Sequence, residues 1–242
     1  MAQVSPTFSP LYRQIKSLIL QALEAGEWRP GQVIPSEQEL AARFNVSQGT
    51  VRKAIDEMAA DNILVRRQGK GTYVASHNDP RQMFRFLRLV PEEGVLTHPR
   101  SVPLDCWRAK AGQEAARMLA IRPGAPIIIL RRVLRFENKP IVADEIYLPE
   151  EIFQGLDLEM LQVWNSSLYS LFETRFGLRM IRAQERIRAV AADRAAADLL
   201  QVDEGTPLLS VERVTYTYGD RPVEWRSGVY STIGHYYLND LS

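Results

Sequence analysis

In residues 35–74, residues typical of helix caps, apolar helix faces and turns follow one another more closely than elsewhere in the chain. Ser36, followed by Glu39 three residues later, forms the capping-box pattern, and Ser47 is a second residue of the type that caps helices. Apolar residues at helical spacing follow each cap and predict two short helices. A β-hairpin with its turn at Gly69 is expected next. The stretch therefore predicts two helices joined by a tight turn, with a β-ribbon after them.

The side chains left outside this unit are mostly polar or basic. Gln48, Gly49, Arg52 and Lys53 lie on the exposed edge at the start of the second helix, which is the part of such a unit that enters a DNA major groove. The hairpin adds basic residues that can follow phosphates, and Gly69 allows close backbone approach. A small protein-interaction module is the alternative interpretation.

Length and composition indicate two domains. A chain of 242 residues exceeds one typical domain, and 45% hydrophobic with 24% charged residues is an ordinary globular composition. Residues 10–23 predict an amphipathic helix that completes the first domain. The polar, proline-containing residues 76–82 predict a linker. We therefore expect a domain over 1–75 and another over 83–242.

The second domain contains an internal repeat with an offset of 81 residues, visible in pairs such as Arg132 and Arg213. Each copy predicts a helix, a turn and two strands, over 112–148 and 193–231. Two such copies imply an α+β domain with a largely antiparallel sheet and a pseudo-two-fold arrangement. A helical stretch is expected over 156–177, and residues 91–103 are expected to form a loop.

Two features of this domain can bind a ligand. A helix that starts near Ser166 and Ser167 would point free amides and a positive dipole at an anion, although most serines at such positions are ordinary N-caps. The strands carry charged residues, including Glu224 and Arg226, which can line a site or only form a solvated face with surface pairs.

Several classes of function find no support in the composition. The single cysteine, Cys106, cannot form an internal disulfide and is expected to be a buried structural thiol in a reducing cytoplasm. The start of the chain has no secretory leader pattern, and no apolar run is long enough to span a membrane. We find no metal cluster or convincing acid/base pair, and we expect no cofactor.

Residues 11–74 resemble the winged helix-turn-helix of the GntR family of bacterial transcription regulators. The motifs that carry the resemblance are Pro-Ser-Glu-x-x-Leu-Ala from Pro35, Thr-Val-Arg from Thr50 and Gly-x-Gly-Thr-Tyr-Val from Gly69. Gln38 and Gln48 stand where many members carry arginine, and glutamine cannot make the bidentate contact to guanine, so the operator is expected to differ from the common family half-site. The resemblance implies DNA contacts by Ser36, Glu37, Gln38, Ser47, Gln48, Gly49, Thr50, Arg52, Lys53, Gln68, Gly69 and Lys70.

Residues 83–242 resemble the UTRA effector-binding domain of the HutC subfamily, whose fold is similar to chorismate lyase. The Gly-x-Pro-Ile and Gly-x-Pro-Leu strand starts and the Ser-Leu-Tyr helix start carry this resemblance. Leu134 stands where members that bind phosphosugars tend to place a second arginine, which favours a carboxylate or another less charged metabolite. The resemblance implies that the effector contacts Arg132, Asp144, Ser167, Tyr169, Glu224 and Tyr230.

The sequence thus predicts a cytoplasmic, homodimeric transcription regulator, expected to be a repressor that a small-molecule effector releases from double-stranded operator DNA. No membrane partner is expected. Two alternatives remain open: a lyase-like enzyme, and a dimeric DNA-binding protein that senses no ligand.

Overall fold

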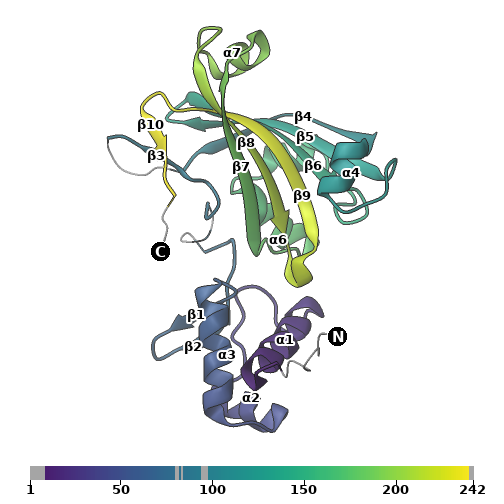
Figure 1. The fold of residues 1–242 in the computed structure, drawn as a ribbon, viewed down its shortest axis with the longest axis vertical. Helices are drawn as coiled ribbons and strands as arrows, with labels where there is room; N and C mark the ends of the chain where they lie inside the picture. The colour runs from purple at the N-terminus through teal and green to yellow at the C-terminus, as the bar shows by residue number, and fades with distance from the viewer. Residues whose placement is uncertain (1–8, 80–81, 83, 94–97, 240–242) are drawn as a thin grey trace, which may run out of the picture. The chain divides into compact units, whose positions relative to one another are not determined.

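The computed structural model describes residues 9–79, 82, 84–93 and 98–239. The chain divides into two compact units, residues 1–79 and 80–242, and this division falls within the predicted linker 76–82. Linker residues 80 and 81, and residues 94–97 of the expected loop, lie outside the described residues. Figure 1 shows the elements of each unit.

The first unit is a three-helix cluster with a β-hairpin, as predicted. Helix α1 buries one face, including Ile15 and Ile19, and packs mainly against α3, whose Val51 and Ile55 are fully buried. These apolar faces form the core of a small domain. The elements are α1 (Leu11–Glu24), α2 (Glu37–Phe44), α3 (Gln48–Ala60), β1 (Leu64–Arg67) and β2 (Gly71–Val74).

Local interactions fix where α2 begins and ends. The Ser36 hydroxyl accepts a hydrogen bond from the Glu39 amide at 3.3 Å, and the Glu39 carboxylate accepts one from the Ser36 amide at 2.7 Å, which completes the predicted capping box. Asn45 ends the helix in the left-handed conformation, with a φ of 52°. Asparagine tolerates this conformation better than most residues, so the chain turns sharply into α3.

The second unit is built on a six-stranded antiparallel sheet with the order β4-β5-β6-β9-β8-β7. A separate pair, β3 (Leu89–Pro91) with β10 (His235–Tyr237), joins the start and the end of the unit. The six strands are β4 (Arg100–Lys110), β5 (Pro126–Phe136), β6 (Lys139–Pro149), β7 (Arg182–Ala191), β8 (Pro207–Tyr216) and β9 (Pro222–Ser231).

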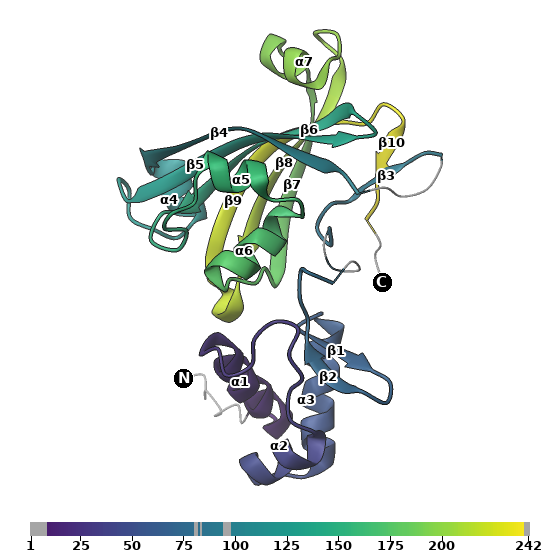
Figure 2. The same cartoon turned by 180° about the vertical axis from the view of Figure 1, so that it is seen from behind.

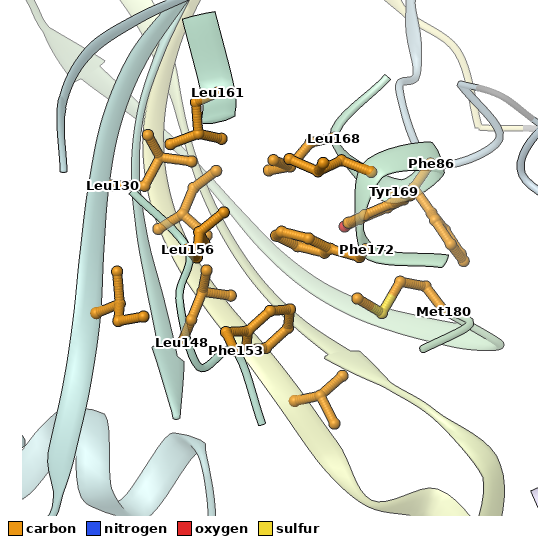
Figure 3. Close-up of a cluster of buried hydrophobic side chains, with 14 residues drawn as sticks. Phe86, Leu130, Leu148, Phe153, Leu156, Leu161, Leu168, Tyr169, Phe172 and Met180 are labelled. Carbon is orange, nitrogen blue, oxygen red and sulfur yellow. The ribbon is translucent and has the colours of Figure 1, made fainter. Parts of the chain in front are cut away.

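The helices of this unit divide between the two faces of the sheet. Helices α5 (Leu158–Val163) and α6 (Leu168–Phe176) cover one face and bury the larger cluster, which includes Phe153 and Phe172; Figure 2 shows both helices in front of the sheet, and Figure 3 shows the cluster. Helices α4 (Gln113–Met118) and α7 (Arg194–Leu200) pack on the other face through two smaller clusters.

The predicted repeat is present, but each copy contains one more strand than predicted. The order in each copy is strand, helix, strand, strand: β4-α4-β5-β6 and β7-α7-β8-β9. The expectation of a loop over residues 91–103 was wrong for Arg100–Pro103, which begin β4. A bulge between Pro103 and Asp105, together with exposed polar residues, gives β4 the irregular pattern of an edge strand.

Candidate functional site

The amino-terminal turn of α3 presents polar side chains to solvent. Ser47 caps the helix, because its hydroxyl accepts a hydrogen bond from the Thr50 amide at 3.2 Å and lies 2.9 Å from the Thr50 hydroxyl. The helix buries its other face in the core of the unit. The exposed residues on this turn and the first turn of α2 include Ser36, Gln38, Ser47, Gln48, Gly49, Arg52 and Lys53.

Glu37 connects this turn to the hairpin. Its carboxylate accepts hydrogen bonds from Arg52 Nε at 2.9 Å, Gln48 Nε2 at 3.2 Å and Arg66 Nη1 at 3.0 Å. Partial burial acts to raise the pKa of Glu37, but the hydrogen bonds from Arg52, Arg66 and Gln48 outweigh it and lower the pKa. Glu37 therefore stays ionised at neutral pH and holds two basic side chains on one surface.

The tip of the hairpin is exposed and basic. Gln68, Gly69 and Lys70 form the turn, and Gly69 has a φ of 69°, which favours glycine. The Arg67 guanidinium lies 4.5 Å from the centre of the Tyr73 ring. Such a hairpin can place cationic groups and main-chain amides along a phosphate backbone.

The second unit contains a buried group of charged side chains on the face of the sheet that α5 and α6 cover. A single Asp144 oxygen, Oδ2, accepts hydrogen bonds from Arg132 Nε at 3.0 Å, Arg132 Nη2 at 2.8 Å and Arg226 Nη1 at 3.2 Å. Burial acts to raise the pKa of Asp144, but Arg132 and Arg226 outweigh it and lower the pKa. This carboxylate thus fixes the positions of two arginines.

Arg226 is held on its other sides as well. Its Nε donates to Glu224 Oε1 at 2.6 Å, and its Nη2 donates to the Tyr169 hydroxyl at 3.1 Å. The Tyr169 hydroxyl also donates to Glu224 Oε1 at 3.1 Å and lies 3.2 Å from Thr215 Oγ1. Every nitrogen of the Arg226 guanidinium therefore has an acceptor within the protein.

A third buried arginine holds the segment that precedes β3. Arg213 Nε donates to Glu185 Oε1 at 2.6 Å, and Arg213 Nη2 donates to the backbone carbonyl of Phe86. The Phe86 ring lies edge-on to the Tyr169 ring, with the ring centroids 5.8 Å apart. Figure 3 labels both residues. Arg213 thereby fixes the backbone of a residue whose side chain reaches the start of α6.

These arginines form part of the wall of a pocket of about 500 Å³, its open mouth included. The pocket lies between the sheet, the start of α6 and the segment 84–87. Its wall consists of Phe84, Phe86, Leu87, Pro99, Ser101, Arg132, Leu134, Ser166, Ser167, Leu168, Tyr169, Arg213, Arg226 and Tyr230.

The predicted effector residues fall into two groups around this pocket. Arg132, Ser167, Tyr169 and Tyr230 are in its wall. Ser167 also caps α6, because its hydroxyl accepts a hydrogen bond from the Ser170 amide at 3.1 Å. The structure places the remaining two, Asp144 and Glu224, behind the wall, where they contact its arginines.

Sequence reasoning did not name Arg213 as a site residue, and it left open whether Arg226 lines a site or belongs to a solvated face. The repeat contained the information for Arg213, because this residue is the equivalent of Arg132 one repeat later. The sheet register adds that Arg132 pairs with Asp144, whereas Arg213 pairs with Arg226. Arg226 therefore occupies the position in its repeat that Asp144 occupies in the first, and the two have opposite charges.

Three further observations concern alternative functions. No group of three or more His, Cys, Asp or Glu side chains in the described part of the chain is arranged to hold a metal ion. Within residues 9–79, 82, 84–93 and 98–239, no helix is long and apolar enough to cross a membrane. Burial raises the pKa of the Cys106 thiol to about 11, so this half-buried cysteine is a poor nucleophile at neutral pH.

A winged helix-turn-helix joined to a domain with an arginine-lined pocket defines a ligand-binding, DNA-binding transcription regulator. Residues 11–74 match the bacterial regulatory proteins of the gntR family, and residues 97–232 match the UTRA domain. The chain belongs to the gntR family and, through its UTRA domain, to the HutC subfamily. The resemblance found in the sequence and the predicted fold class are confirmed.

Named relatives and solved structures support the same assignment. The chain is 30% identical to the "Probable fructoselysine utilization operon transcriptional repressor" of Escherichia coli, in a match that covers 88% of this chain and 87% of the relative. It is 28% identical to the histidine utilization repressor of Pseudomonas putida, in a match that covers 92% of this chain and 88% of the relative. The ligand-binding domain of a GntR-family regulator from Bordetella bronchiseptica is 46% identical, with a TM-score of 0.64, over 66% of this chain and 99% of that chain.

Proposed function

We propose that this protein represses transcription as a homodimer and that a small anionic metabolite, bound in the pocket beside Arg132, releases it from its operator. The observation that carries the proposal is the presence in one chain of a basic helix-turn-helix surface and a pocket with three buried arginines. Relatives named as repressors of utilization operons support the sign of the regulation.

In this proposal, the first turn of α3 reads base edges in the major groove. Arg52, Gln48 and Thr50 lie on that turn, and the hairpin tip at Gly69 lies over the neighbouring backbone. Two copies would place two such helices in successive major grooves, about 34 Å apart, on a pseudo-palindromic operator. Because glutamine reads adenine, Gln38 and Gln48 favour an operator with adenines where relatives read guanine.

Release by the metabolite requires that the ligand bind one conformation of the dimer better than another. Phe84, Phe86 and Leu87 are in the pocket wall and follow the predicted linker directly, so a ligand in the pocket touches the segment that leads to the DNA-binding unit. We propose that the ligand stabilises a position of this segment in which the two recognition helices no longer fit successive grooves. The protein would act in the cytoplasm, where its operator DNA is, and would perform no catalysis.

A gel-shift titration with DNA from upstream of the protein's own gene tests the DNA-binding half. Arg52→Ala should weaken specific binding, whereas Arg29→Ala, a change of another exposed arginine in the same unit, should not. Equal affinities for wild type and Arg52→Ala would show that α3 does not read the operator.

Ser167→Ala and Tyr230→Phe test release by the metabolite. Both variants should bind the operator normally and need more metabolite for release.

An enzymatic role is the second candidate, because the predicted chorismate-lyase-like fold includes enzymes, but fold alone does not carry function. Conversion of chorismate by the purified protein would support that role and contradict the proposal.

A further inference from the structure

Two exposed glutamines lie on the proposed DNA-reading surface, and their side chains are held differently. Gln48 Nε2 donates a hydrogen bond to Glu37 Oε2 at 3.2 Å. Gln38 has no side-chain hydrogen bond to any of the described residues. The amide of Gln38 can therefore turn either end towards DNA, whereas contact with a carboxylate restricts the amide of Gln48.

The carboxylate of Glu37 determines which end of the Gln48 amide faces it. An ionised carboxylate only accepts hydrogen bonds, so the NH₂ group of Gln48 must point towards Glu37. The opposite orientation would lose this hydrogen bond and place the amide oxygen against a carboxylate oxygen. The Gln48 oxygen, Oε1, is therefore turned away from Glu37, and it accepts no hydrogen bond from the described part of the chain.

Glu37 is itself fixed in place. Its Oε2 also accepts a hydrogen bond from Arg52 Nε at 2.9 Å, and its Oε1 accepts one from Arg66 Nη1 at 3.0 Å. Arg66 is held in turn by Asp56, whose Oδ1 lies 2.7 Å from Arg66 Nη2. The Glu37 side chain is only 14% exposed, whereas that of Arg52 is 58% exposed. Glu37 is thus a fixed acceptor beside Gln48 and not a mobile surface charge.

The group that Gln48 presents limits the bases that it can read. In the major groove, adenine N6 and cytosine N4 are donors, whereas guanine O6 and thymine O4 are acceptors at the equivalent positions. A carbonyl oxygen held towards the groove can accept from adenine or cytosine, but it is repelled by the oxygen of guanine or thymine. A glutamine whose amide turns freely lacks this discrimination, because its NH₂ group can donate to guanine or thymine.

From these contacts we infer that Glu37 is a positioning residue for base readout. It orients the Gln48 amide so that Gln48 accepts a hydrogen bond from the exocyclic amino group of an adenine or cytosine and rejects guanine and thymine. This inference rests on the proposed function, because it requires that the first turn of α3 enter the major groove of an operator. It also separates two glutamines that residue type alone makes equivalent, since only Gln48 has a fixed amide.

The test begins with selection of bound sequences from a random double-stranded DNA library by the full-length protein. The same selection with Gln48→Ala identifies the base pair that Gln48 reads, because the preference at that pair should disappear while the rest of the site is kept. Purine in place of adenine, or 2-pyrimidinone in place of cytosine, then removes the amino group at that pair. Wild type should lose about tenfold in affinity for the changed DNA, and Gln48→Ala should lose none.

The role of Glu37 is tested by a transition at the same pair, from adenine to guanine or from cytosine to thymine. The transition replaces a donor by an acceptor at the same position and should weaken wild-type binding about tenfold or more. In Glu37→Gln and Glu37→Ala the loss should be about threefold or less, because the Gln48 amide can turn. Glu57→Gln is the control: it removes the same charge from a residue that contacts Lys16, and it should keep the wild-type loss.

The possible failures are distinct. Wild-type binding that does not depend on the amino group, or a Gln48→Ala variant that selects the wild-type site, overturns the readout by Gln48. An undiminished loss in Glu37→Gln and Glu37→Ala, with both variants folded by circular dichroism, overturns the role of Glu37. If wild type enriches no sequence from the library, the proposed function itself fails.

Discussion

Gly228 lies in the middle of β9, directly opposite Asp144 on β6, and has no side chain for a steric reason. A Cβ atom at this position would lie 2.6 Å from Asp144 Oδ1, 3.0 Å from the Ala143 carbonyl oxygen and 3.1 Å from the Tyr230 ring. Gly228 is not among the glycines with positive φ, so alanine could adopt its backbone conformation. Gly228→Ala therefore tests the packing around the buried charges without adding backbone strain.

The size of the effect follows from these distances. Ordinary contact begins at 3.4 Å, so Asp144 Oδ1 is roughly 0.8 Å too close, and the Ala143 carbonyl belongs to the backbone and cannot easily move. Overpacking of this kind costs about 1–3 kcal/mol. Displacement of Asp144 also weakens its bonds to Arg132 and Arg226, and hydrogen bonds to charged groups contribute about 1.5–3 kcal/mol each.

We expect a loss of about 3 kcal/mol, which lowers the melting temperature of a unit of this size by roughly 6–12 °C. Differential scanning calorimetry on full-length wild type and Gly228→Ala measures it, and calorimetric titration should show weakened ligand binding. Gly112→Ala is the control, because no atom lies within 4 Å of its added Cβ and its φ is −66°. Gly112 is the N-cap of α4, where alanine is less favourable than glycine, so the control should lose no more than about 1 kcal/mol. A melting temperature within about 1 °C of wild type for Gly228→Ala would refute the proposed packing around Asp144.

Three further predictions concern individual side chains. Glu37→Gln removes the charge that holds Arg52 and Arg66, so operator affinity should fall about three- to tenfold in a fluorescence anisotropy titration; unchanged affinity would exclude this role. Burial raises the pKa of Cys106 to about 11, so a thiol reagent at pH 8 should label the native protein far more slowly than the protein in urea, and equal rates would contradict this. Because the pKa of Asp144 is lowered in the folded protein, its ionised carboxylate stabilises the fold at pH values above the unfolded pKa of about 4, and this stabilisation is lost as the pH falls through the folded pKa. Asp144→Asn should remove that part of the acid dependence of stability in urea unfolding, and an identical acid dependence in wild type and variant would disprove it.

The fold of the first unit could be predicted closely, because the residues that specify its helix ends and its turn act on neighbours only a few positions away in the sequence. The capping box at Ser36, the cap at Ser47 and the glycine in the hairpin turn each act within a few residues, and each is present in the structure. The interaction of Glu37 with Arg66 could not be predicted, because it joins residues 29 positions apart that come together only in the folded unit.

The sheet of the second unit was predicted in part, from the repeat. Its inner strands have apolar patterns that indicate strands. The edge strands β4 and β7 contain no fully buried position and their burial patterns do not alternate regularly, so hydrophobic periodicity missed them. Without buried positions, an edge strand lacks the apolar/polar alternation on which such predictions depend.

The pocket required the three-dimensional structure. Asp144, Glu224 and the arginines are adjacent in the sheet register, yet which of them face the pocket depends on α6 and on residues 84–87. Phe86 in particular lies far from Arg213 in sequence and is held there by a hydrogen bond to its backbone carbonyl. A backbone contact of this kind leaves no pattern in the side chains.

The most direct measurement is a titration of fluorescently labelled DNA from upstream of the protein's own gene with the purified full-length protein, at fixed salt and with random DNA as competitor. A ligand-released homodimeric repressor should bind this DNA at two chains per site, at least about a thousandfold more tightly than the competitor, and should dissociate when the metabolite of the regulated genes is added. Equal affinity for the two DNAs, or specific binding that no such metabolite weakens, would contradict it.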